Sequence, residues 1–149
     1  MRYVFDTKKS RRYRFPTYFN DLVLDRAEST VSEVFVVIIE PGKASHFHKH
    51  DDMEQIFYVV EGNGVLTVGE RKRRYMIKPA HIVRIPPGTL HSVGPKGRNP
   101  IKYICIDCFL SPDKRKEPTW ESHVKVICKE QGFRFEDVAG SVKRKLHKK

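Results

Sequence analysis

The chain has 149 residues, of which 29 are Lys or Arg and 18 are Asp or Glu, so its formal net charge at pH 7 is +11. A chain of this length suits one domain with a sizeable core. Its longest apolar run, residues 34–39, is far too short to cross a bilayer. The first residues, MRYVFDTKKSRR, lack the apolar centre of a signal peptide, so we expect a soluble cytoplasmic protein without a membrane partner.

The positive charge is clustered in three runs, at 8–14, 71–74 and 143–149. Runs of like charge usually lie on solvated faces, so we expect the second and third runs to be exposed and dispensable for ligand binding. A basic surface also attracts anions and nucleic acid. Because no helix-turn-helix, zinc-finger or RNA-binding signature accompanies the charge, nucleic acid is not an expected partner.

In chain order, residues 1–30 alternate between polar and aromatic residues. Pro16 and Asn20-Asp21 are residues typical of β-turns. Residues 31–112 form a succession of short apolar, often β-branched runs separated by Gly, Pro, Asn and Asp. This pattern predicts an all-β fold. The expected strands are 31–40, 45–50, 55–60, 64–68, 74–78, 82–85 and 101–110.

After residue 112 the apolar period changes from strand-like to helical. Trp120, Val124, Ile127 and Cys128 follow the spacing of one helix face. Thr119 suits the N-cap and Gly132 suits the position just past the end, so the pattern predicts a helix over 119–131.

The chain has three cysteines, an odd number that does not suggest a disulfide framework. Cys105 and Cys108 lie three apart in a strand-like run, and residues three apart on a strand face opposite ways. We therefore expect these two thiols to be core or covered residues that do not share a metal.

Histidines provide the strongest indication of chemistry. His46, His48 and His50 occupy every second position, and on a strand such residues share one face. A fourth, His91, follows the turn Pro86-Pro87-Gly88. Imidazole is a common ligand of zinc, copper, nickel and iron, so two histidines from one segment and one from a later hairpin predict a three-nitrogen metal site.

These two segments resemble the motifs of the cupin superfamily. In the first, Gly42 precedes His48 and His50 by the family spacing, and Gly62 closes the motif. In the second, Pro86-Pro87-Gly88 is followed after two residues by His91. Ala80 stands where the family has a Gly, and Pro95 stands where it has an Asn.

The resemblance implies a single small cupin domain over 1–149. It implies a double-stranded β-helix, or jelly-roll barrel, of two antiparallel sheets with a short C-terminal α-helix. Residues 1–30 would add N-terminal strands and contact the partner in a homodimer, 31–112 would form the barrel, and 113–149 would form the helix and a basic tail.

The ligand set that the resemblance implies is His48, His50, His91 and the residue in the family's Glu position. Counting back from Gly62, that position holds Gln55. Glu54 and His46 are the alternatives, the first if a bulge near 51–52 turns it inward. The ion would be one divalent transition metal, Zn, Ni, Fe, Mn or Cu, because a nitrogen-rich site disfavours calcium and magnesium.

The functional expectation is a metalloenzyme acting on a small organic anion, with dioxygenase-type chemistry favoured over sugar or keto-acid isomerisation. The alternative is a non-catalytic module that binds a metal or small ligand, since cupins also include storage proteins and regulators. Possible acid–base residues are His46, Tyr58, Tyr75 and Tyr103. His81 and His123 are interpreted as surface histidines.

Overall fold

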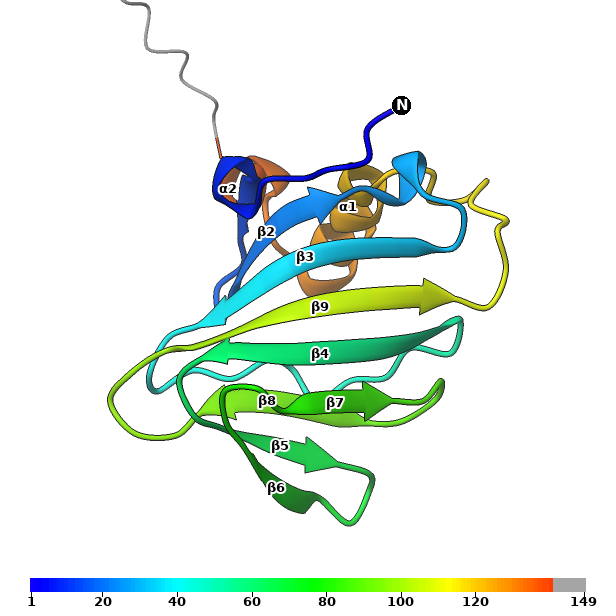
Figure 1. Ribbon diagram of the computed structural model, residues 1–149. Helices are drawn as coiled ribbons and strands as arrows, with labels where there is room; N and C mark the ends of the chain where they lie inside the picture. Colours follow the sequence, from blue (N-terminus) through cyan, green and yellow to red (C-terminus); the bar gives the residue numbers. More distant parts are fainter. Residues whose placement is uncertain (141–149) are drawn as a thin grey trace, which may run out of the picture.

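The computed structural model describes residues 1–140, which form two antiparallel β-sheets and two C-terminal helices (Figure 1). The larger sheet has the order β1-β2-β3-β9-β4-β7 and the smaller has the order β6-β5-β8. The strands are β1 (Arg11–Arg14), β2 (Phe19–Leu24), β3 (Ser32–Ile39), β4 (Met53–Glu61), β5 (Gly64–Val68), β6 (Arg73–Ile77), β7 (Ile82–Ile85), β8 (His91–Pro95) and β9 (Ile101–Phe109). The predicted double-stranded β-helix is confirmed.

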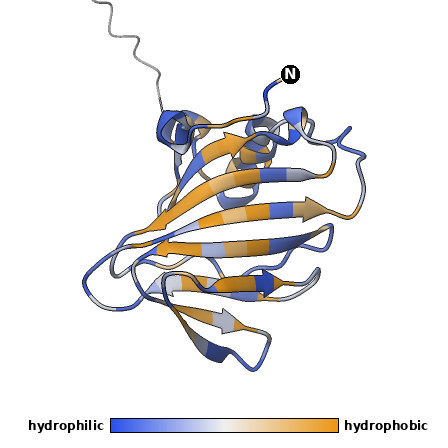
Figure 2. Ribbon diagram, viewed as in Figure 1, coloured by the Kyte–Doolittle hydropathy of each residue, from blue (hydrophilic) through white to orange (hydrophobic). Residues whose placement is uncertain are grey.

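The core lies between the two sheets because successive side chains of each strand alternate between buried and partly exposed positions. On β9, Ile101, Tyr103, Cys105 and Asp107 are the buried members of this alternation. Figure 2 shows the resulting mixture of hydrophobic and hydrophilic residues along β3, β9 and β4. Cys108 falls on the other side of β9 from Cys105, as its spacing predicts, and all three cysteines are free.

The N-terminal strands extend the large sheet of their own chain. β2 pairs with β3 over Phe19–Leu24, and β1 pairs with β2 at the sheet edge. Tyr13 and Phe15 are both buried by this arrangement. Pairing of this segment with a second chain stays a prediction.

Helix α1 (Trp120–Gln131) confirms the helix expected over 119–131. Thr119 and Ser122 form a reciprocal capping box, and Gly132 ends the helix with a left-handed φ of 74°. Trp120 packs against Phe35 of β3 with ring centroids 4.9 Å apart, and this contact places the helix beside the large sheet (Figure 1). A second short helix, α2 (Phe135–Ala139), was not predicted, because five residues are too few to show a helical period.

The expected strand over 45–50 is wrong. Residues 44–47 have no regular structure, and the segment makes only an isolated antiparallel bridge between His48 and His91. It is tied to β8 by hydrogen bonds from Ser45 N to Val93 O (2.9 Å), from His48 N to His91 O (3.1 Å) and from His91 N to His48 O (2.8 Å). The segment thus follows β8 without a continuous ladder.

The basic run at 71–74 is exposed, whereas the predicted basic tail at 143–149 lies outside the described residues. Among residues 1–140, neither helix has the length and apolar character needed to span a bilayer.

Two glycines provide a matched test of the close approach between the turn after β4 and the start of β9. Gly62 and Gly69 have the same φ of +76°, but a Cβ on Gly62 would lie 2.1 Å from the carbonyl oxygen of Pro100, whereas a Cβ on Gly69 would meet nothing within 4 Å. We expect Gly69→Ala to cost only the left-handed strain, roughly 1–2 kcal/mol. Gly62→Ala should cost about 2 kcal/mol more, because the backbone must move. Urea unfolding of both variants measures the difference, and equal costs would contradict the close approach.

Candidate metal centre

A cavity of about 80 Å³ lies between the sheets and beneath α1. Its walls come from β2, β3, β4, β8, β9, the segment before β4, and the inward face of α1. The lining residues are Tyr18, Asn20, Phe35, Val37, Ser45, His48, His50, Gln55, Phe57, His91, Val93, Tyr103, Cys105, Asp107, Trp120, His123 and Ile127. Most of this wall is apolar, and imidazoles, an amide and a carboxyl group form the polar part.

Three of the predicted histidines meet in this cavity. One ring nitrogen from each of His48, His50 and His91 can be chosen so that all three lie within 4.8 Å of one another. The Nε2 atoms of His48 and His50 are 3.1 Å apart. The backbone bridge between His48 and His91 sets this arrangement, since it aligns the two residues although 43 positions separate them.

Backbone carbonyls fix the orientation of two of these rings. The Nδ1 of His48 lies 2.5 Å from the carbonyl oxygen of His46, and the Nδ1 of His91 lies 2.8 Å from that of Thr89. A carbonyl oxygen only accepts, so each Nδ1 carries the hydrogen and donates it. In a neutral ring the Nε2 atom then keeps a lone pair, and both lone pairs are available inside the cavity.

Burial favours the neutral form of these rings. Desolvation lowers the pKa of His48 and lowers the pKa of His50 to about 3 and that of His91 to about 4. The positive charges that neighbouring rings would carry act in the same direction on His50. At neutral pH the cluster therefore offers unprotonated nitrogens, which is the form that binds a metal ion.

Gln55 on β4 is buried and completes the cluster. Its Oε1 lies 3.0 Å from Nε2 of His91, and its Nε2 donates to Asp107 Oδ1 at 2.8 Å. An amide oxygen and an unprotonated imidazole nitrogen are both acceptors, so no hydrogen bond joins them. A cation between them would satisfy both lone pairs, and on this observation the residues fit a divalent transition metal.

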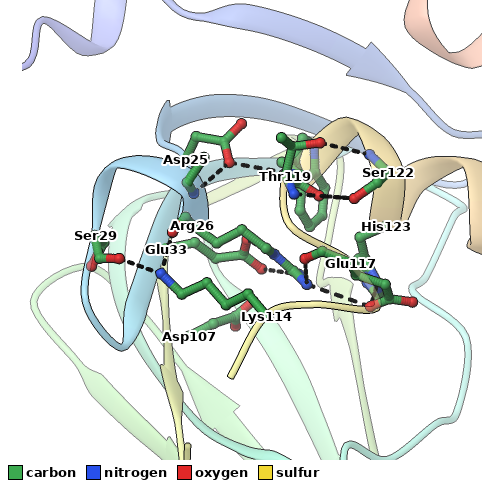
Figure 3. Close-up of polar contacts among 12 residues, drawn as sticks. Asp25, Arg26, Ser29, Glu33, Asp107, Lys114, Glu117, Thr119, Ser122 and His123 are labelled. Carbon is green, nitrogen blue, oxygen red and sulfur yellow. Dashed lines mark hydrogen bonds and ion pairs between the residues drawn. The ribbon is translucent and has the colours of Figure 1, made fainter. Parts of the chain in front are cut away.

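Behind Gln55 a row of buried polar groups crosses the sheet. The strand register places Asp107 opposite both Gln55 of β4 and Glu33 of β3. Burial, followed by the hydrogen bond with Glu33, raises the pKa of Asp107 well above its usual range. A protonated Asp107 can donate to Glu33 and still accept from Gln55. Glu33 is in turn paired with Arg26 through two 2.8 Å hydrogen bonds (Figure 3).

The residues of this row were not predicted. Glu33 and Asp107 are acidic residues within otherwise apolar strands, and that contrast is the signal that could have found them, because a buried charge requires a partner. Arg26 carries no such signal, since it lies in a short 3₁₀ turn (Arg26–Glu28) between β2 and β3.

The two alternative ligands lie elsewhere. Glu54 is on the outward-facing side of β4 and forms a 2.8 Å ion pair with Arg84. His46 is exposed, and its carbonyl oxygen rather than its ring contacts His48. Of the three candidates for the fourth ligand, Gln55 is the one that lies beside the histidine cluster.

The candidate acid–base residues also differ in whether they line the cavity. His46, Tyr58 and Tyr75 are exposed away from the cavity, whereas Tyr103 lines it. Complete burial raises the pKa of Tyr103 well above its usual value, so this hydroxyl stays protonated.

His81 is exposed as expected, but the interpretation of His123 as a surface histidine is wrong. His123 lies on the inward face of α1 and lines the cavity, with Nδ1 2.9 Å from Oε2 of Glu117. Its position four residues before Ile127 and one turn after Trp120 was the available signal, because both flanking residues belong to the apolar face of the helix.

The chain is thus a double-stranded β-helix in which three imidazoles converge in the interior. Residues 35–107 match the family model described as a cupin domain. The chain therefore contains a cupin domain and belongs to the cupin superfamily.

One curated relative, an uncharacterised protein of Methanocaldococcus jannaschii, is 34% identical over 75 residues. The match covers 50% of this chain and 57% of the relative, so this chain spans little more than half the length of that protein. It supplies no function.

Two solved structures share the fold. A predicted oxalate decarboxylase from Thermotoga maritima has a TM-score of 0.65 at 17% identity, covering 72% of this chain and 100% of its own. The polyketide cyclase RemF from Streptomyces resistomycificus has a TM-score of 0.64 at 16% identity, covering 72% and 79%. At this identity the likeness shows the fold alone.

The ligand geometry predicts opposite effects on metal binding for different substitutions. His48→Ala and His91→Ala should each abolish metal binding, measured by elemental analysis after dialysis. Gln55→Glu should tighten binding, because it places a negative charge next to the ion. Glu54→Gln is the matched control and should leave the metal content unchanged. Loss of metal in Glu54→Gln with no effect of Gln55→Glu would show that Glu54 is the ligand.

The lowered histidine pKa values generate a stability prediction for the metal-free protein. An unfolded histidine titrates near pH 6.5, whereas the folded His50 and His91 resist protonation down to about pH 3 and 4. Between these limits the unfolded state binds more protons, so the free energy of unfolding falls as the pH falls below about 6.5. We expect a loss of roughly 1–2 kcal/mol per ring between pH 7 and pH 5.

Chelator-treated protein unfolded with urea at each pH provides the measurement. His50→Gln removes one titrating ring and should show a shallower dependence. An identical pH dependence in this variant would contradict the burial of His50 in its neutral form.

Proposed function

We propose that the protein is a metal-dependent enzyme that acts on a small organic anion held in the cavity, with dioxygenation as the reaction type. The observation that supports this most directly is the convergence of three neutral imidazoles and the amide oxygen of Gln55 inside a mostly apolar cavity. Within this cluster the acceptor Oε1 of Gln55 faces the acceptor Nε2 of His91 at 3.0 Å, an arrangement that a cation between the two atoms would stabilise.

The residues that would hold the ion are His48, His50, His91 and Gln55. Zinc, nickel, iron, manganese and copper all suit this donor set. A bound ion would supply Lewis acidity, and with iron, nickel or copper it would also supply one-electron chemistry towards oxygen.

The missing carboxylate sets the charge of the site. All four donors are neutral, so the site would keep the full charge of the ion and attract an anion. Burial raises the pKa of Asp107, which disfavours a negative charge behind Gln55. The positive net charge of the chain adds a long-range attraction for the same kind of ligand.

The cavity walls determine what can bind. Phe57 and Val93 provide apolar surface on the barrel side, and Ile127 provides apolar surface on the α1 side. The cavity volume of about 80 Å³ limits the ligand to a small molecule. Excluding water strengthens the attraction between the polar groups and a bound anion.

The second candidate is a non-catalytic module that binds a metal or small ligand. It is favoured by one observation, that none of the four proposed donors, His48, His50, His91 and Gln55, is a carboxylate. Two proteins that share the fold bear enzyme names, a predicted oxalate decarboxylase and a polyketide cyclase, so the fold is compatible with catalysis.

Elemental analysis followed by oxygen-uptake screening tests the proposal. Protein reconstituted separately with each of the five metals is offered diketones, catechols and sugar phosphates. We expect oxygen consumption with at least one diketone or catechol and its loss in the His91→Ala variant. Ligand binding without turnover of any compound would favour the binding module, and conversion of a sugar phosphate without oxygen uptake would favour an isomerase.

A further inference from the structure

We propose that His123 is the acid–base residue of this cavity and that Glu117 holds it in position. The inference assigns the substrate class more narrowly than the proposed function on which it rests. The substrate would be a small compound with an acidic hydroxyl, such as an enol or a catechol, which gives its proton to His123 as it binds and becomes the anion.

The first supporting observation is the location of His123. It lies on α1, on the same helix face as Trp120 and Ile127, and all three line the cavity that contains His48, His50 and His91. Its side chain keeps 19% of its accessible surface, so it is neither sealed in the core nor free in solvent. Among residues 1–140, it is the one histidine that lines this cavity without belonging to the proposed ligand set.

The second observation is the anchoring of the ring. Nδ1 of His123 lies 2.9 Å from Oε2 of Glu117, and the same oxygen lies 3.4 Å from Nη1 of the buried Arg26 (Figure 3). An ionised carboxylate only accepts, so Nδ1 carries a hydrogen and donates it. The neutral ring therefore keeps its lone pair on Nε2, the nitrogen left for a ligand.

The charged groups around His123 suit a reversible proton transfer. Glu117 faces it directly and would stabilise an imidazolium. Arg26 stands behind Glu117, and its charge is offset by its pair with Glu33. On its other side, His123 shares the cavity with His50, and both residues line it.

The transfer step is a simple proton movement. The substrate O–H bond breaks, its electron pair stays on the oxygen, and a new N–H bond forms at Nε2 of His123. The product is an anion on the metal side of the cavity and an imidazolium on the α1 side, with Glu117 beyond it. No oxidant or reductant is needed, and the net charge of the cavity contents does not change.

The number of protons released on binding tests the inference separately from turnover. Zinc-loaded protein is titrated with acetylacetone at pH 8 by calorimetry in two buffers that differ in ionisation enthalpy. In the wild type the proton moves to His123, so we expect little net release. His123→Gln keeps a donor for Glu117 but lacks a base, so it should release about one proton per ligand and bind about tenfold more weakly, the equivalent of one pKa unit.

Two further variants separate proton transfer from a structural role. His81→Gln changes an exposed histidine remote from the cavity and should behave like the wild type. Glu117→Gln keeps a hydrogen-bond acceptor but removes the charge, so it should release an intermediate number of protons. Zinc content should be unchanged in all three variants, because none alters His48, His50, His91 or Gln55.

Azide provides the independent check, because it is already an anion and needs no base. It should therefore bind the wild type and His123→Gln with similar affinity at pH 8. Proton release and affinity for acetylacetone that are the same in His123→Gln as in the wild type would overturn the assignment of His123. Failure of both azide and acetylacetone to bind the zinc-loaded wild type would overturn the proposed function itself.

Discussion

The paired hydrogen bonds between the backbones of His48 and His91 are the interaction on which the site depends. The segment before β4 lacks regular secondary structure, and this bridge holds it against β8 together with the hydrogen bond from Ser45 N to Val93 O. It places two imidazoles from one segment next to a third from another. The carbonyls of His46 and Thr89 then orient two of the rings from their own backbones. Ligand geometry therefore follows from local backbone structure rather than from long, flexible contacts.

A second constraint is the solvation of buried charge. Arg26 and Glu33 are both almost fully buried, and such a pair is stable only when each partner satisfies the other. The pair also supports Asp107 on one side and Glu117 on the other. Lys114 donates to the backbone carbonyls of Arg26 and Ser29 (Figure 3), which ties the segment before α1 to the same cluster. One network thus orients both the amide of Gln55 and the ring of His123.

Much of the fold could be predicted from the sequence because its apolar runs and turn residues are short and regular. The alternation of His48 and His50 indicated that both rings point the same way, and this holds although the segment is not a strand. The residues that were missed depend on long-range pairing. Asp107 becomes significant only when the register sets it between Gln55 and Glu33. His123 becomes significant only when Trp120 packs on Phe35 and brings α1 over the cavity.

The C-terminal helix also bears on how proteins with this barrel diverge. The proposed metal ligands lie within the 35–107 segment that matches the cupin model, whereas Glu117 and His123 lie beyond it. The helix follows the barrel in the chain, and Trp120, Val124 and Cys128 are its residues buried in the core. An exchange of the segment after β9 that keeps these buried residues would therefore replace the proposed proton acceptor and leave the proposed ligands in place. A barrel of this kind can acquire new reactions when only the segment after its last strand varies, so new reactions do not require changes within the barrel itself.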